Sequence, residues 1–308
     1  MNLRPLRPAA AGLLCAVAFL TACSAGPSGS ASQSTQPKVP VVASTNVYGS
    51  IAAAVGGDHV AVTSIITDPS ADPHSYEAAP ANAAAVRDAK IVIANGGGYD
   101  DFMAKLVSAA GSNPKFIDVS ELSGLKPAGG GDFNEHVWYS LPTVRKLAAT
   151  LATELGAADS VNASTYTANA QAFNTTLDGV QSKIDAIKAK HNGNKVAVTE
   201  PVPGYLVDAA GLVNTTPEAF AKAVETDTDP PAAVLQATLQ LFTGPDKVRV
   251  LIANSQTEKA TTRQVEATAT AAGVPIVKVT ETLPAGVNDY VGWMGGQVDA
   301  LSAALDRP

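Results

Sequence analysis

The chain has 308 residues, a formal net charge of −7 and an apolar content of 46%. That length supports more than one lobe around an ordinary hydrophobic core. The acidic balance argues against nucleic acid and anionic lipid as partners, because both repel a negatively charged protein. The sequence has four histidines and two cysteines, and it shows no nucleophile motif and no Gly-rich phosphate loop.

Residues 1–22 predict a signal peptide. Arg4 and Arg7 give it a positive start, and the apolar stretch 9–20 has 12 residues, too few to span a bilayer. The stretch runs into the tetrapeptide LTAC, which looks like a bacterial lipobox ending at Cys23. We therefore expect a lipid on Cys23 and an extracytoplasmic protein anchored to the outer face of the bacterial cell membrane. The plainer alternative is an ordinary signal peptide with a chance cysteine.

The predicted leader also changes the composition of the mature chain. Cys15 leaves with it, so the mature protein is expected to have no disulfide and no thiolate metal ligand. Residues 23–38 are rich in Ser, Gly, Pro and Gln and predict a flexible, lipidated tether. Loss of Arg4 and Arg7 moves the net charge from −7 to −9, because the leader holds no acidic residue. An acidic mature surface mildly favours the attraction of cations.

From residue 39 onward, apolar strand patterns alternate with helical patterns. The predicted strands are 41–44, 60–66, 91–94, 195–199, 248–253 and 275–280. The predicted helices of the first half are 47–55, 80–89, 100–110 and 141–155. This alternation predicts an α/β fold with two lobes, each a mainly parallel sheet flanked by helices. We place the N-terminal lobe at 39–160 and the C-terminal lobe at 192–308.

The segment 161–191 between the lobes has the most regular helical period. Its apolar residues recur every three or four positions: Tyr166, Ala170, Phe173, Leu177, Val180, Ile184 and Ile187. They make one stripe on a helix of about 27 residues, roughly 40 Å long. A surface helix or a coiled-coil strand would show the same stripe. Its place between two α/β halves favours one long rigid helix that joins the lobes.

Two histidines and two glutamates stand where an α/β fold gathers ligands. Glu200 and Glu281 directly follow predicted strands, and ligands collect at the carboxyl ends of parallel strands. Asn254 follows a third strand and is expected beside them. His74 lies in a Pro-containing loop after a strand of the first lobe, and His136 shortly precedes a helix. Two imidazoles of one lobe are therefore expected to face two carboxylates of the other across a cleft.

Each of these residues also has a plain structural explanation. A histidine in a loop is often a hydrogen-bonded surface residue, and Glu200 before Pro201 could cap a helix. His59 and His191 show that alternative, because neither has a partner near it in the sequence pattern. The pattern alone leaves a four-ligand site and four separate structural roles both open.

Several motifs follow one another in a fixed order over nearly the whole mature chain. They are residues 41–46, Asp72-Pro73-His74-Ser75-Tyr76-Glu77, His136-Val137-Trp138, Glu200 with Gly204-Tyr205-Leu206, Glu281-Thr282-Leu283, Tyr290 and Trp293-Met294. In this order they resemble the metal-binding solute-binding lipoproteins of zinc and manganese ABC importers (the ZnuA/TroA/PsaA-like family, cluster A-I). The resemblance implies two α/β lobes joined by one long helix, which agrees with the periodicity of 161–191.

The resemblance implies His74, His136, Glu200 and Glu281 as ligands of a transported Mn²⁺ or Zn²⁺. It also implies delivery to the ABC permease of the same system and no enzymatic activity, and we expect a monomer. Glu200 replaces the usual zinc-type His, as in manganese-type members, and Glu281 replaces the usual Asp. A His-rich acidic loop of zinc-type members is missing at 128–133. Because zinc binds such mixed N/O sets more tightly than manganese, affinity alone does not identify the metal.

Three alternative functions can be compared with metal import. An exported metallohydrolase could use the same His/carboxylate site, with Glu135 or Glu77 as a base beside His136 or His74. The chain has no H-E-x-x-H motif to support it. A siderophore or haem binder is disfavoured by an aromatic content of 5%. An adhesin role could coexist with import but leaves no signature in the sequence.

Overall fold

A computed structural model describes residues 37–307 of the chain. The predicted signal peptide, the proposed lipid attachment at Cys23 and nearly all of the predicted tether lie outside these residues. Within the described part, no helix is both long and apolar enough to cross a membrane.

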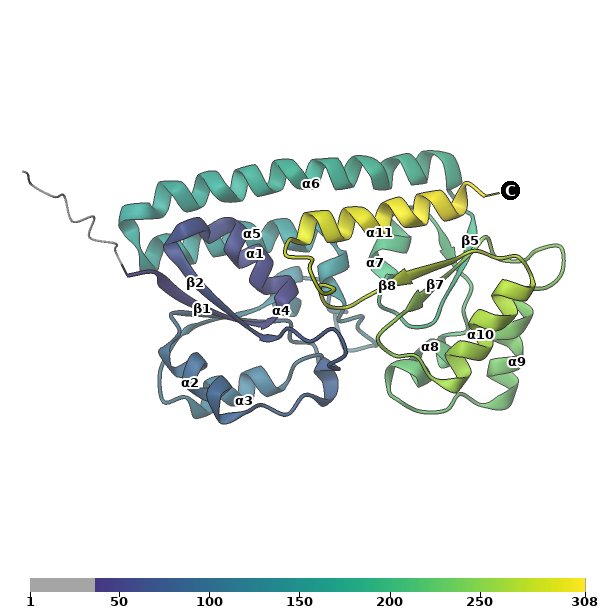
Figure 1. Ribbon diagram of the computed structural model, residues 1–308, viewed down its shortest axis with the longest axis horizontal. Coiled ribbons are helices and arrows are strands. Elements are labelled where there is room, and N and C mark those ends of the chain that lie inside the picture. The colour runs from purple at the N-terminus through teal and green to yellow at the C-terminus, as the bar shows by residue number, and fades with distance from the viewer. Residues whose placement is uncertain (1–36, 308) are drawn as a thin grey trace, which may run out of the picture. The chain divides into compact units, whose positions relative to one another are not determined.

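The first lobe is built on a four-stranded parallel sheet of order β2-β1-β3-β4 (Figure 1). Its strands are β1 (Val39–Thr45), β2 (Val60–Ile66), β3 (Ile91–Ala94) and β4 (Lys115–Asp118). Its helices are α1 (Asn46–Gly56), α2 (Pro80–Asp88), α3 (Phe102–Ala109), α4 (Val119–Ser123) and α5 (Leu141–Ala158). Short 3₁₀ turns η1 (Gly57–His59), η2 (Pro73–Ser75) and η3 (Val137–Tyr139) interrupt the loops.

Both faces of this sheet are covered by helices. Alternate residues of the central strands point to opposite faces, as the strand period of two requires. Val41 and Ile91 join the core that contains α1 and α5, whereas Val42 and Val92 join the core that contains α2 and α3. Burial on both faces explains why these strands read as continuous apolar runs.

The second lobe repeats the plan with sheet order β6-β5-β7-β8, again parallel. Its strands are β5 (Lys195–Val198), β6 (Val213–Asn214), β7 (Val250–Asn254) and β8 (Ile276–Val279). Its helices are α7 (Gly204–Ala209), α8 (Glu218–Glu225), α9 (Ala232–Gln240), α10 (Ala260–Ala271) and α11 (Tyr290–Leu305). The sequence prediction of two parallel-sheet lobes is confirmed.

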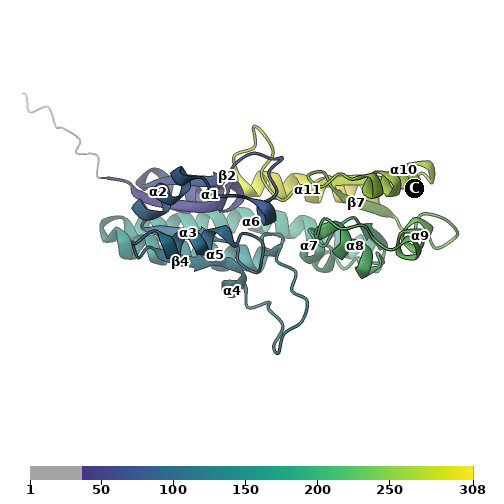
Figure 2. The same ribbon diagram turned by 90° about the horizontal axis from the view of Figure 1, so that it is seen from below.

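One helix of 29 residues, α6 (Ala163–His191), links the lobes after the short turn η4 (Ser160–Asn162). All seven residues of the predicted apolar stripe are buried along it. The helix packs on α1 and α5 of the first lobe and on α7 and α11 of the second. Figures 1 and 2 show α6 running beside α11 from one lobe to the other. The prediction of one long joining helix is therefore confirmed.

Two strands were not predicted from the sequence. β4 has only four residues, and three of them are exposed or partly exposed; β6 has two residues, both exposed. Both lie at sheet edges, where one flank is unpaired and burial is lower, so their apolar pattern is weak.

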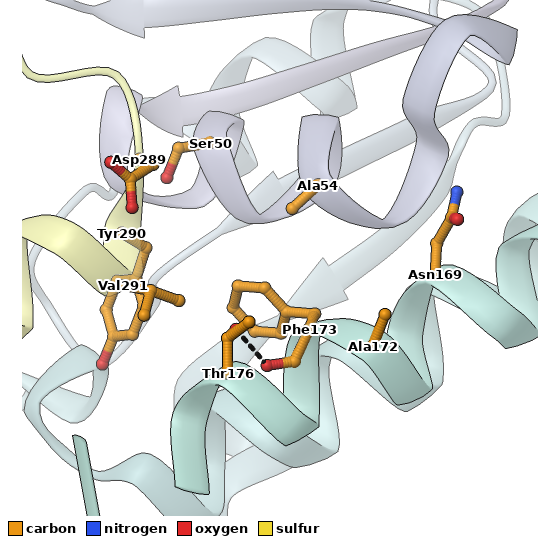
Figure 3. A pocket seen from close by; sticks show the side chains of 9 residues that line it. All are labelled: Ser50, Ala54, Asn169, Ala172, Phe173, Thr176, Asp289, Tyr290 and Val291. Atoms are coloured by element: carbon orange, nitrogen blue, oxygen red, sulfur yellow. Dashed lines mark hydrogen bonds between the residues drawn. The ribbon is translucent and has the colours of Figure 1, made fainter. Parts of the chain in front are cut away.

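A groove of about 400 Å³ lies between α1, α6 and the start of α11 (Figure 3). Ala54, Ala172 and Phe173 give it an apolar wall. Its carboxylate, Asp289, already accepts a hydrogen bond from the Gly292 amide and so caps α11. The lining residues include no histidine, and this groove is not a metal-donor site.

The packing of α6 predicts opposite effects for two neighbouring substitutions. Leu177→Ala should lower the free energy of unfolding by about 2–5 kcal/mol, because it leaves a cavity on the buried face of α6. Gly179→Ala should raise it by roughly 0.5–1 kcal/mol, because Gly179 is exposed, has no atom within 4 Å of an added Cβ and only gains helix propensity. Urea unfolding followed by circular dichroism measures both. Equal effects of the two variants would contradict the buried stripe.

Candidate metal centre

His74 and His136 of the first lobe are held in the same way. Asp72 caps η2 by accepting a hydrogen bond from the His74 amide at 2.9 Å, and its Oδ1 lies 3.1 Å from His74 Nδ1. Asn134 likewise accepts from the His136 amide at 3.1 Å, and its Oδ1 lies 2.7 Å from His136 Nδ1. Each imidazole is fixed through Nδ1, which leaves Nε2 directed away from its own loop.

The hydrogen-bond network assigns the tautomer of His136. The Asn134 amide nitrogen donates to the Pro201 carbonyl at 2.9 Å, so its Oδ1 is the atom that faces the ring. His136 Nδ1 must therefore carry the proton, and Nε2 presents a lone pair. Metal-binding histidines commonly donate their second ring nitrogen in this way, which orients the ring.

Three polar side chains come from the carboxyl edge of the second sheet. Glu200 follows β5 by two residues, Asn254 ends β7, and Glu281 follows β8 by two residues. Asn254 Nδ2 donates to Glu281 Oε1 at 2.7 Å, and the Thr257 hydroxyl donates to Glu200 Oε2. The parallel topology thus brings both predicted carboxylates to one edge.

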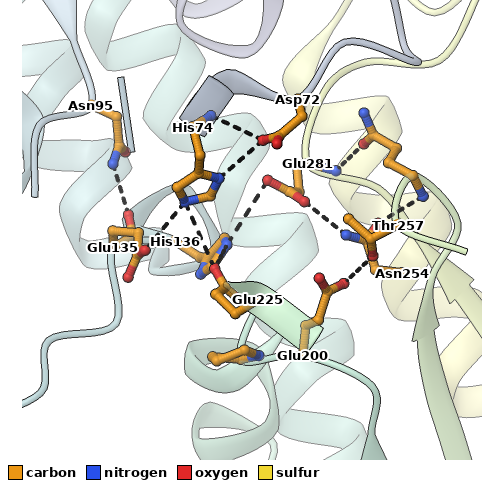
Figure 4. A network of polar contacts seen from close by, with 12 residues as sticks. Asp72, His74, Asn95, Glu135, His136, Glu200, Glu225, Asn254, Thr257 and Glu281 are labelled. Atoms are coloured by element: carbon orange, nitrogen blue, oxygen red, sulfur yellow. Dashed lines mark hydrogen bonds and ion pairs between the residues drawn. The ribbon is translucent and has the colours of Figure 1, made fainter. Parts of the chain in front are cut away.

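A sixth side chain, Glu225, lies between these groups (Figure 4). It is the last residue of α8, and its Oε1 is 3.3 Å from His136 Nε2 and 3.9 Å from His74 Nε2. His136 Nε2 is also 3.9 Å from Glu281 Oε2, and His74 Nε2 is 3.4 Å from Glu135 Oε1. His74, Glu135 and Glu225 each offer an atom within 4.8 Å of the other two. Imidazoles of one lobe therefore face carboxylates of the other.

Sequence reasoning missed Glu225. It occupies a position on the buried side of α8, next to Val224 and one turn after Ala221, where an apolar residue would be expected. A charged residue in an apolar helix stripe was the signal that could have found it.

The structure separates the other predicted residues from this cluster. His191 pairs with Asp306 at 2.8 Å, and His59 packs its ring edge-to-face against Tyr166. Glu77 lies in an exposed loop. Glu200 lies at the same sheet edge as Glu281 but is not part of the group whose donor atoms lie within 4.8 Å.

The cluster becomes more exposed from His136 towards His74. The exposed fraction of the side chain is 0% for His136, 7% for Glu281, 13% for Glu225, 18% for Glu135 and 29% for His74. A cavity of about 350 Å³ beside it is lined by Glu135 and Glu225 and, farther out, by Asp132, Glu218 and Lys222. The cluster is therefore fully buried at His136, and an acidic cavity adjoins its carboxylates Glu135 and Glu225.

Burial and charge shift the pKa values of these groups in opposite directions. Burial lowers the pKa of His136 to about 4. Burial also lowers the pKa of His74, but its hydrogen bonds with Asp72 and Glu135 outweigh burial and raise it to about 10. Burial together with the neighbouring carboxylates raises the pKa of Glu281 to about 7 and that of Glu225 to about 9. Several carboxylates cannot all ionise here unless a cation joins them.

Comparison with known proteins identifies the family. Two parallel-sheet lobes joined by one long helix form the fold of the periplasmic zinc-binding protein TroA from Treponema pallidum, whose structure superimposes with a TM-score of 0.72 at 19% identity, covering 88% of this chain and all of that one. The family model described as zinc-uptake complex component A, periplasmic (ZnuA), matches residues 41–304. The chain belongs to this family.

Curated relatives are more similar to this chain in sequence than that solved structure is. The manganese-binding lipoprotein MntA of Bacillus subtilis is 33% identical over 136 residues, which cover 42% of this chain and 44% of the relative. The manganese ABC transporter substrate-binding lipoprotein ScaA of Streptococcus gordonii is 27% identical over 266 residues, 82% of this chain and 79% of that protein. The chain spans about half the length of several curated relatives that it matches.

The raised pKa of Glu225 predicts a pH dependence of stability in chelator-treated protein. Between its unfolded pKa near 4.5 and its folded pKa of about 9, the folded chain holds a proton at Glu225 that the unfolded chain has lost. This contribution to stability is present below pH 4.5 and is lost as the pH rises towards 9. Glu225→Gln cannot ionise and should not show this loss of stability. The unfolding free energy of the variant minus that of the wild type should therefore rise from pH 5 to 9.

Urea unfolding at several pH values measures this difference. The matched control is Glu218→Gln, which removes the same charge from the exposed start of α8. If the difference in unfolding free energy between Glu225→Gln and the wild type does not change with pH, the buried, crowded environment of the Glu225 carboxylate is contradicted.

Proposed function

We propose that this protein captures a divalent transition metal between its two lobes and delivers it to the permease of an ABC importer. One observation carries the proposal: buried donor atoms of both lobes converge without satisfying one another. His136 Nε2 and Glu281 Oε2 are buried and have no hydrogen-bond partner among residues 37–307. Buried polar atoms are normally paired, and unpaired donors that converge are what a bound cation would satisfy.

The proposed ligands are His74, His136, Glu200 and Glu281. The two imidazoles would bind through Nε2, because Nδ1 of each ring is already hydrogen-bonded. His136 Nε2 has no partner in the described part of the chain, whereas His74 Nε2 would have to exchange its contact with Glu135 for the metal. If both imidazoles are neutral and both glutamates are ionised, their charge of about −2 balances a divalent ion. Glu200 has to approach from the edge of the second sheet, where it now accepts from Thr257.

The proposed metal is Mn²⁺ or Zn²⁺ as the transported substrate. A set of imidazoles and carboxylates suits both, because carboxylate oxygen fits manganese and mixed N/O sites also bind zinc. Relatives carry both names: MntA and ScaA are described as manganese proteins, and the family model as a zinc-uptake component. Because two of the four proposed ligands are glutamates, the site offers carboxylate oxygen as well as imidazole nitrogen.

Release to a permease requires only a limited opening. α6 packs against both lobes, and hydrogen bonds cross between them on both sides of the site. The Tyr205 hydroxyl donates to the Asn134 carbonyl at 2.6 Å, and the Tyr139 hydroxyl donates to the Thr280 carbonyl at 2.8 Å. With this bracing, we expect local loop shifts or a small rotation of one lobe rather than a wide hinge motion.

The family relationship supports a binding protein. Proteins of this family are substrate-binding components of transporters and not enzymes. Nothing in the relatives supports the alternative of an exported metallohydrolase. Glu135, the base considered for it, lies 3.4 Å from His74 Nε2 and is paired with that imidazole.

We also propose that the protein acts at the cell surface. A lipid at Cys23 would hold the protein at the outer face of the bacterial cell membrane, where it meets the permease as a monomer. Relatives described as lipoproteins support an extracytoplasmic site of action. The tether 23–38 would leave the lobes free to reorient towards the transporter.

Metal binding is tested first on mature, unlipidated protein treated with chelator. Mn²⁺ or Zn²⁺ at 100 times its dissociation constant should add about 2.7 kcal/mol of stability and raise the unfolding midpoint by several degrees. Ca²⁺ should have little effect, because imidazole is a poor ligand for it. Thermal unfolding at increasing metal concentration measures the shift.

Two substitutions and one control locate the binding. His74→Ala and His136→Ala should abolish most of the metal-dependent shift while leaving the circular dichroism spectrum unchanged. His59→Ala is the matched control, since it removes a first-lobe imidazole that packs on Tyr166 away from the cluster. A wild-type shift in both site variants, or no shift with any metal in the wild type, would refute metal capture at this site.

A further inference from the structure

Glu225 is placed like a ligand although it is not one of the four proposed residues. Figure 4 shows its side chain reaching from the end of α8 towards both imidazoles. Its Oε1 lies 3.3 Å from His136 Nε2 and 3.9 Å from His74 Nε2. Donor atoms bound to one ion at 2.0–2.2 Å are separated by about 3–4 Å, and these distances fall in that range.

Several buried polar atoms at and beside the Glu225 carboxylate have no hydrogen-bond partner in the described part of the chain. Both of its carboxylate oxygens are buried and lack a hydrogen-bond partner in the described part of the chain. His136 Nε2, from a side chain with 0% exposure, is also unpartnered and lies against it. Glu281 Oε2 is the third unpartnered atom, 3.9 Å from that nitrogen. Glu225 and Glu281, from separate segments, therefore each bring an unpartnered carboxylate oxygen close to the His136 nitrogen.

Local electrostatics oppose a carboxylate at this position unless a cation is present. Glu225 ends α8, and the C-terminal end of a helix carries partial negative charge. Glu135 and Glu200 are further anionic neighbours. By contrast, Glu135 has a partner in His74 at 3.4 Å, and Glu200 has one in Thr257. Glu225 is the carboxylate that gains most from a metal ion.

We propose that Glu225 is a fifth protein ligand of the captured metal. This inference rests on the proposed metal-capture function and sharpens its substrate class. Two imidazoles and three carboxylates carry a charge of about −3 and supply at least five donor atoms. Such a set favours oxygen-preferring ions of coordination number five or six, of which Mn²⁺ is the example among the two candidates, over a tetrahedral Zn²⁺.

The test compares Glu225→Gln with Glu218→Gln in the otherwise complete mature protein. Both substitutions remove one carboxylate from α8 and from the same cavity lining, but only Glu225 touches the imidazoles. Dissociation constants for Mn²⁺ and Zn²⁺ are measured by competition with a chelating dye. The visible spectrum of bound Co²⁺ is the second readout, because its absorption strengthens when coordination falls from five or six to four.

The proposal expects Glu225→Gln to weaken Mn²⁺ binding by on the order of 10–100-fold or more, since even outer partners of a metal cost that much. Zn²⁺ binding should weaken less, which shifts selectivity towards zinc, and the Co²⁺ absorption should become stronger. Glu225→Asp retains a carboxylate and should keep the weak wild-type absorption. Glu218→Gln should match the wild type in every measurement.

Two results would overturn the assignment. The first is Glu225→Gln with the same Mn²⁺ affinity and Co²⁺ spectrum as Glu218→Gln. The second is a loss of affinity with an unchanged Co²⁺ spectrum, which would mean that Glu225 acts only through its charge. Either result leaves metal capture intact if the wild type binds metal and His136→Ala does not. A wild type that binds no metal would instead remove the proposed function itself.

Discussion

The burial of several carboxylates beside two imidazoles is the constraint on which the rest of this structure depends. Removing an ionised carboxylate from water is costly unless an opposite charge replaces the water. Here Glu225 and Glu281 come from the second lobe, whereas Glu135 and both imidazoles come from the first, so a cation held among them would also join the lobes. The cluster is costly without a cation, and under the proposed function it would link the lobes when a cation is bound.

Hydrogen bonds and helix packing fix the positions of the residues around this cluster. Each imidazole is fixed through Nδ1 by an oxygen acceptor two residues before it, Asp72 or Asn134. Asn134 also donates to Pro201 of the other lobe, so one side chain positions a candidate ligand and bridges the cleft. α6 adds a continuous apolar contact along both lobes. Binding in such a frame depends on preformed geometry rather than on large domain closure.

Glu225 changes how the donor set is understood. A four-residue site of two histidines and two glutamates is balanced for a divalent ion, whereas a third carboxylate makes it electron-rich and oxygen-rich. Metal choice in such a site would follow from coordination number and charge rather than from inherent affinity, which always favours zinc over manganese. Glu200, which stands where zinc-type members have His, points in the same direction.

The sequence by itself determined the elements with strong local patterns. Continuous apolar strands, the stripe from Tyr166 to Ile187, and the order of the His and Glu motifs all follow from short-range rules, and they were enough to predict two α/β lobes and one joining helix. Weakly apolar edge strands such as β6 escaped, because their stability comes from pairing and not from their own residues. Only the tertiary structure decided which donors meet. Glu225 lies 89 positions after His136 (225 minus 136) on a short helix whose sequence indicates no ligand, and only the tertiary structure brings the end of α8 to that imidazole.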